Sequence, residues 1–144
     1  MSTASVTTKD EADILELHHQ FVAANENIDV DWLRAHLAAD ALVWFNLNKS
    51  DYIGAEHICR LWDFLRAVAG GAEQHVESIE PKVHVVGDVA WVDSHLRLRA
   101  DFGPMGKIEQ SARMTEIWQR DGDGWLMRHF HCSEHEPDGW EGGR

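Results

Sequence analysis

A carboxylate and two histidines near the end of the chain lie on what the sequence predicts to be a β-hairpin. Glu116 lies in the first strand, His129 and His131 lie in the second, and a Gly-rich turn joins the strands. If the turn occupies residues 121–124, Glu116 faces His129, and opposed residues share one face of a sheet. That face is otherwise apolar and rich in tryptophan, so the pattern predicts a pocket with polar groups at one end.

A histidine opposite a carboxylate is equipped for proton transfer, because imidazole titrates near neutral pH and the carboxylate fixes its tautomer. Glu116 and His129 would form such a dyad, with His131 beside them. A structural ion pair, or a pair across a dimer interface, is the alternative. A three-residue loop would instead place Thr115 opposite His129.

A second polar set lies on the preceding predicted strand. Asp93, His95 and Arg97 alternate along it. Asp93 could form a dyad with His95 or Arg97, and an arginine inside a cavity stabilises negative charge on oxygen. The alternate residues are more apolar, however, and could be the core face, which would place the polar set outside; they are Val92, Ser94, Leu96 and Leu98.

The remaining histidines and the composition bear on which cofactors, partners and cellular location to expect. His129 and His131, with His135 or Glu116, allow a metal-site interpretation, but no metal or other cofactor is expected. His18 lies near the apolar stripe of the first predicted helix, where a core histidine is the alternative to a cavity group.

The net charge of −12 argues against nucleic acid or an anionic membrane as partners. Two cysteines are too few for a disulfide framework, so a cytoplasmic location is expected.

The chain reads as one domain over 1–144, with a core over about 10–135 and a flexible acidic tail over 136–144. Apolar periodicity and turn residues predict helices first and strands later, which indicates an α+β domain. The expected helices are 10–25, 30–37 and 55–69; the expected strands are 41–47, 74–86, 89–102, 107–120 and 124–133, with a loop over 48–54.

This order of elements, together with several motifs, resembles the SnoaL-like and ketosteroid-isomerase-like branch of the nuclear transport factor 2-like superfamily. The motifs are Ala39-Asp-Ala-Leu-Val43, Gly54-Ala-Glu-His-Ile58, Gly87-Asp-Val-Ala-Trp-Val92, Arg113-Met-Thr115 and the segment from Asp121 to Ser133. The resemblance covers roughly residues 10 to 135. It implies a cone-shaped fold, with three N-terminal helices packed on a curved antiparallel (mixed) sheet around one cavity, and a homodimer formed through the sheets.

The resemblance also places individual residues. The isomerases' catalytic tyrosine falls at Phe21 and their aspartate base near Phe45, so steroid isomerisation by that machinery is not expected. Their oxyanion-hole acid matches Glu116, and a pocket tyrosine matches Trp62. Cavity-facing positions match Trp91, Asp93, His95, Arg97, His129, His131 and Ser133.

These observations predict a cofactor-free acid/base enzyme, with lyase or dehydratase ahead of isomerase, acting on a small hydrophobic and aromatic molecule. His129, oriented by Glu116, would transfer the proton, while His131 and Arg97 stabilise charge. The expected substrate contacts are Trp62, Trp91, Trp118, Phe21, Phe45, Asn46 and Tyr52. The competing interpretation is a non-catalytic binding or oligomerisation module of the same fold.

Overall fold

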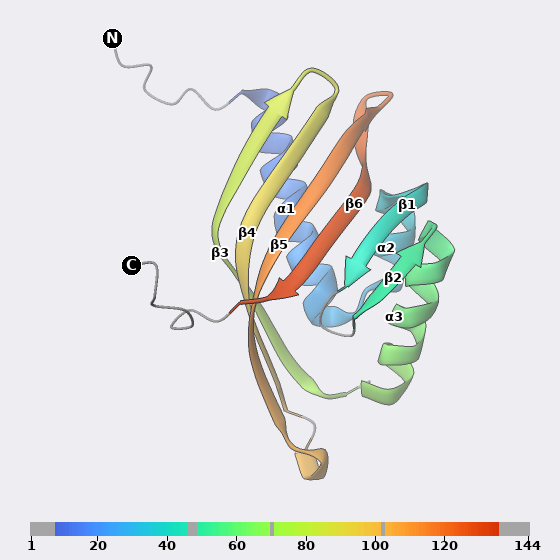
Figure 1. Cartoon of the computed structure of the whole chain (residues 1–144), viewed down its shortest axis with the longest axis vertical. Coiled ribbons are helices and arrows are strands. Elements are labelled where there is room, and N and C mark those ends of the chain that lie inside the picture. Colours follow the sequence, from blue (N-terminus) through green and yellow to red (C-terminus); the bar gives the residue numbers. More distant parts are fainter. Residues whose placement is uncertain (1–7, 46–48, 70, 102, 136–144) are drawn as a thin grey trace.

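The computed structural model describes residues 8–45, 49–69, 71–101 and 103–135. Within these ranges the chain forms two helices, two strands, a third helix and four long strands (Figure 1). The bounds are Lys9–Asn27 (α1), Val30–His36 (α2), Leu37–Phe45 (β1), Ser50–Ile53 (β2), Ala55–Ala69 (α3), Glu73–Val86 (β3), Val89–Asp101 (β4), Gly103–Met105 (η1, a 3₁₀ turn), Lys107–Asp121 (β5) and Gly124–Glu134 (β6).

The strands form one mixed, open and curved sheet in the order β2-β1-β6-β5-β4-β3. β1 and β6 pair in parallel, and the other neighbours are antiparallel. α1 packs along the long strands, while α3 lies beside β1 and β2 (Figure 1). The predicted α+β fold with three helices on a curved sheet is therefore confirmed.

Local signals in the sequence explain where the first two helices begin. Thr8 caps α1, because its hydroxyl accepts a hydrogen bond from the Glu11 N–H while the Glu11 carboxylate accepts one from the Thr8 N–H. Asp29 caps α2, because its carboxylate accepts a hydrogen bond from the Trp32 N–H at 3.1 Å. The helices thus start where side chains satisfy their first free amides.

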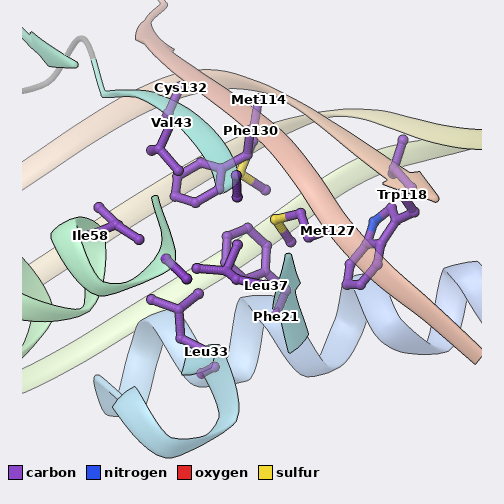
Figure 2. Packing of buried hydrophobic residues seen from close by; sticks show 14 of the residues in the cluster. Phe21, Leu33, Leu37, Val43, Ile58, Met114, Trp118, Met127, Phe130 and Cys132 are labelled. Carbon is purple, nitrogen blue, oxygen red and sulfur yellow. The ribbon is translucent and has the colours of Figure 1, made fainter. Parts of the chain in front are cut away.

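The core fills the space between the helices and the inner face of the sheet. Phe21 from α1, Ile58 from α3, and Met114 and Phe130 from the strands converge there (Figure 2). Each is at most 4% exposed. None of the helices in the described part of the chain combines the length and apolar character needed to cross a bilayer.

The β5–β6 hairpin begins as predicted, with Asp121 paired to Gly124 and Trp118 to Met127. A β-bulge then interrupts the ladder, because Ile117 pairs with His129 and leaves Arg128 as an extra residue on β6. One inserted residue reverses which side chains of a strand face inward. The expected pairing of Glu116 with His129 is therefore wrong, as is the alternative with Thr115, and Glu116 pairs with Phe130.

The first part of the sheet also differs from the expectation. The segment 50–53, predicted to be loop, forms the short edge strand β2, and β1 begins at Leu37 rather than at residue 41. Tertiary pairing of β1 with β6 on one side and with β2 on the other accounts for both differences. The acidic tail 136–144 lies outside the described residues.

Arg120 ties the start of α1 to the end of the sheet. Its guanidinium donates to Asp10 at 2.8 Å and to Asp88 at 2.8 Å, and it lies 4.4 Å from the centre of the Trp125 ring. The hydrogen bond from Arg120 is the main cause that lowers the pKa of Asp10.

This ion pair predicts a specific acid sensitivity. Because the pKa of Asp10 is lowered in the folded state, its contribution is present above the unfolded pKa and is lost as the pH falls through the folded value. The difference in melting temperature between wild type and Asp10→Asn should therefore be largest near neutral pH and shrink below about pH 4. Thermal unfolding from pH 7 to pH 3 measures it. Asp123→Asn, in the exposed turn of the β5–β6 hairpin, is the control; an equal pH dependence for both variants would contradict the role of Asp10.

The bulge also predicts that the thiol of Cys132 is protected from solvent in the folded protein. This residue is 3% exposed on the inner side of β6, and its burial raises the pKa of the thiol to about 12. In the Cys59→Ser background, the native thiol should resist a thiol-specific reagent at pH 8 and react on unfolding.

The matched control is His131→Cys in a background without the native cysteines, since His131 is exposed one residue away on the opposite face. That thiol should react readily in the folded protein. Fast labelling of Cys132 in the native state would mean that β6 runs without the bulge.

Candidate active site

A histidine, a glutamate and a serine form a hydrogen-bonded relay in the interior. His18 Nδ1 lies 2.5 Å from Glu116 Oε2, and His18 Nε2 lies 2.7 Å from Ser78 Oγ. The Trp118 indole N–H donates to Glu116 Oε1 at 3.0 Å. His18 and Glu116 are 0% exposed. The relay joins α1 to β3 and β5 across the helix–sheet interface.

The helical period brings His18 to this place. Ile14, His18 and Phe21 recur at helical spacing and are all fully buried against the sheet. On the sheet side, Glu116 and Trp118 alternate on the inner face of β5, and Ser78 occupies the inner face of β3 opposite Leu96. Two strands and one helix therefore position the polar atoms, and none of them comes from a loop.

The hydrogen bonds define what the relay can do. A neutral His18 that donates from Nδ1 to Glu116 accepts at Nε2 from the Ser78 hydroxyl. In this order of hydroxyl, imidazole and carboxylate, the imidazole can accept the hydroxyl proton, while the carboxylate fixes the tautomer of the imidazole and stabilises the imidazolium. A buried carboxylate is costly unless it is paired and hydrogen-bonded, and Glu116 meets that condition through two donors.

Aromatic rings lie beside the relay. Phe21 stacks on Trp62 at 6.4 Å and on Trp32 at 5.8 Å, and its ring meets that of Phe130 at 5.1 Å. Trp62 is 4% exposed, and Trp118 is fully buried. Three of the predicted substrate contacts, Phe21, Trp62 and Trp118, therefore lie in the interior with Glu116.

The placement expected for the two histidines of β6 is wrong. The bulge at Arg128 turns His129 and His131 to the outer face, where Trp44 meets both rings edge to face at 5.2 and 5.6 Å. His129 Nδ1 donates to the Leu42 carbonyl at 2.8 Å. Neither histidine joins Glu116 in the interior.

The polar set on β4 also lies on the outer face of the sheet, which is the alternative that the apolar residues between its members had indicated. Val92, Ser94 and Leu96 face inward and are buried, so the intervening residues face away from the helices; these are Trp91, Asp93, His95 and Arg97. Asp93 accepts a hydrogen bond from His84 Nε2 at 2.9 Å, and the His84 ring stacks on Trp91 at 4.8 Å. Burying the more apolar of the two faces decides this orientation.

Two further predicted contacts, Tyr52 and Phe45, belong to β2 and β1. Tyr52 is partly buried, packs against the core and meets the His57 ring at 4.9 Å. Phe45 ends β1 in register with Cys132. Asn46 lies outside the described residues. Over the described ranges, no three His, Cys, Asp or Glu side chains gather as a metal-binding group.

Glu116 was a predicted site residue, whereas the sequence signals for the other two members of the relay, His18 and Ser78, are weak. His18 was a candidate cavity group, but an equally good core histidine, because one helix face cannot show what lies opposite it. Ser78 carried no motif. A usable signal is that Ser78 and Ser94 each occupy an inward position on a strand whose other inward residues are largely apolar.

Comparison with known proteins identifies the family to which the chain belongs. The model of the SnoaL-like domain matches residues 14–136. Among solved structures, an NTF2-like protein of unknown function from Pseudomonas putida has a TM-score of 0.75 at 22% identity, over 92% of this chain and 88% of the other. A candidate dehydratase of the NTF2-like family from Streptomyces avermitilis has a TM-score of 0.78 at 17% identity, over 90% and 99%.

A candidate aromatic ring hydroxylase from Novosphingobium aromaticivorans has a TM-score of 0.75 at 16% identity, over 90% of this chain and 91% of the other. The TM-scores establish a shared fold, and at these low identities they show nothing about the reaction. The match to the family model spans most of the chain, so this protein belongs to the SnoaL-like domain family.

Proposed function

We propose that this protein is a cofactor-independent general acid/base enzyme that acts on a small hydrophobic, aromatic substrate. The relay of Ser78, His18 and Glu116 in an otherwise apolar interior is the observation that carries the proposal. Burying a hydrogen-bonded imidazole and carboxylate this deeply is costly, and a similar volume of apolar side chains would often stabilise a fold as well. A function in proton transfer explains why the groups are there.

In this mechanism Ser78 is the end of the relay nearest to the substrate, because it is only half-buried while His18 and Glu116 are fully buried. A proton taken from the substrate passes through the Ser78 hydroxyl to His18, and Glu116 stabilises the imidazolium that forms. The reverse transfer returns it to another atom of the substrate. Phe21, Trp62 and Phe130 hold the ring.

Isomerisation, dehydration and retro-aldol cleavage all begin with such a transfer. We place lyase or dehydratase chemistry ahead of isomerisation, since phenylalanines occupy the positions that resemblance gives to the isomerases' tyrosine and aspartate base, namely Phe21 and Phe45. The candidate dehydratase among the structural neighbours supports this order by analogy of fold.

The step common to these reactions can be tested without the natural substrate. Wild-type protein should accelerate exchange of the α-protons of 2-tetralone in D₂O, and Glu116→Gln should reduce the acceleration about 100-fold or more. The amide cannot stabilise an imidazolium by charge, although it occupies the same space. Proton NMR follows the exchange, and circular dichroism checks the fold.

His129→Gln is the matched control, because it alters an imidazole on the outer face and should leave exchange unchanged. If Glu116→Gln exchanges at the wild-type rate, or if the wild type adds nothing to the buffer rate, the acid/base proposal is wrong.

A non-catalytic binding or oligomerisation module is the second candidate. It is favoured by one observation: His18 is fully buried and both of its ring nitrogens are already hydrogen-bonded, as in a structural network. Under that interpretation, replacing both partners by apolar residues, His18→Leu with Glu116→Met, should preserve stability and ligand binding.

Under either candidate we propose a homodimer formed through the outer face of the sheet, and a cytoplasmic location. Large apolar side chains lie on that face, with Trp44 at 44% and Ile53 at 74% exposed. The two free, buried cysteines are compatible with a reducing compartment.

The dimer predicts an effect of charge on the outer face. Trp44→Glu combined with Ile53→Glu should convert a dimer into a monomer in light scattering coupled to size exclusion. Phe64→Glu is the control, since Phe64 is 61% exposed on α3, away from that face. A monomeric wild type would contradict the proposed dimer.

A further inference from the structure

Ser94 carries a buried hydroxyl that has no hydrogen-bond partner in the described part of the chain. It lies on the inner face of β4 and is 6% exposed, and its Oγ makes no hydrogen bond to any residue in the described ranges. An unpaired hydroxyl in a protein interior destabilises the fold, because it has lost its hydrogen bonds to water without replacing them. Most buried polar atoms in folded proteins have a partner, so an exception at this position points to a bound polar group.

The backbone beside Ser94 is irregular. On β3, Ile79 pairs with His95 and Lys82 pairs with Asp93, so Glu80 and Pro81 together lie opposite Ser94. Glu80 has a φ of 51°, which is uncommon for a residue other than glycine. Pro81 has no N–H to donate. A bulge with a strained residue often marks a place where a sheet serves a purpose other than packing.

Ser94 also lies between the two groups that flank His18. It pairs with Met114, two residues from Glu116 on β5, and its neighbour Leu96 pairs with Ser78 on β3. Ser94 is therefore a diagonal neighbour of both Ser78 and Glu116, at Cβ separations of about 7 Å. An atom bonded to Ser94 Oγ would lie beside the relay.

The charge of the interior restricts which chemical group of a ligand can bind to Ser94 Oγ. In the described part of the chain, the buried polar side chains are His18, Ser94 and Glu116, without a lysine or arginine among them. His18 is already bonded to Glu116. A ligand carboxylate would meet the carboxylate of Glu116 with no free buried cation to pair with, whereas a neutral oxygen needs only a hydrogen bond.

We propose that Ser94 Oγ binds a neutral oxygen, a hydroxyl or a carbonyl, of the apolar ligand and holds it beside the relay. This inference rests on the proposed function and narrows its substrate class to neutral alcohols, phenols and ketones, excluding carboxylic acids. Ser94 is then the residue that orients the oxygen, while Ser78 and His18 move the proton.

Three fluorobenzenes that differ only in the substituent para to fluorine test the proposal by ¹⁹F NMR titration. Wild-type protein should bind 4-fluorophenol more tightly than fluorobenzene, and 4-fluorobenzoate most weakly. Ser94→Ala should weaken 4-fluorophenol about 5- to 10-fold, the loss of one hydrogen bond, and leave fluorobenzene unchanged. Ser111→Ala on the outer face of β5, opposite Arg97, is the matched control and should bind all three as wild type does.

Equal affinity of Ser94→Ala and wild type for 4-fluorophenol would overturn the inference, as would tighter binding of 4-fluorobenzoate or no binding of any probe. Failure here is separable from failure of the proposed function. Loss of exchange in Glu116→Gln with no effect of Ser94→Ala on binding would reject the inference alone. A binding effect of Ser94→Ala with normal exchange in Glu116→Gln would reject the enzyme and keep the oxygen site.

Discussion

The contact between His18 and Glu116 is the interaction on which the arrangement of helix and sheet depends. It fixes the middle of α1 to β5, and through Ser78 to β3. The two ends of the helix are held in other ways: Arg120 holds Asp10 at the start, and near the end Glu26 accepts from the Val76 N–H at 2.9 Å. A helix attached at three points cannot slide over its sheet. The geometry of the relay is therefore as rigid as the fold itself, which general acid/base chemistry requires.

Much of the fold could be predicted from the sequence, because its signals are local. Gly87-Asp88 and the turn after Asp121 mark where strands reverse, and Asp29 marks the start of a helix. The helix over 55–69 was predicted with its observed bounds, since its apolar stripe and the following glycines agree. Apolar periodicity and turn-forming residues determine such features, and both can be recognised within a short stretch of sequence.

The candidate site was harder to predict, for a physical reason. Glu116 was identified, but its partner was not, because the pairing of β5 with β6 depends on a bulge that no local residue type requires. Counting back from the turn gave the correct partners as far as Trp118 and the wrong ones beyond it. His18 and Ser78 lie 60 residues apart in sequence and meet only when the helix packs on the sheet. Proximity of this kind is a property of the tertiary structure.

The bulge at Arg128 has a consequence for how such domains diverge. Because the bulge sets the facing of all later residues of β6, a strand of the same length that ran without it would turn Phe130 and Cys132 outward and His129 and His131 inward, whereas loss of Arg128 itself would restore a regular ladder with the present facing. Two relatives with nearly the same residues could then have differently lined interiors. Alignments that place no gap at this position would equate side chains that never occupy the same space, so a shared motif after Arg128 is evidence of a shared interior only when the register of the hairpin is known.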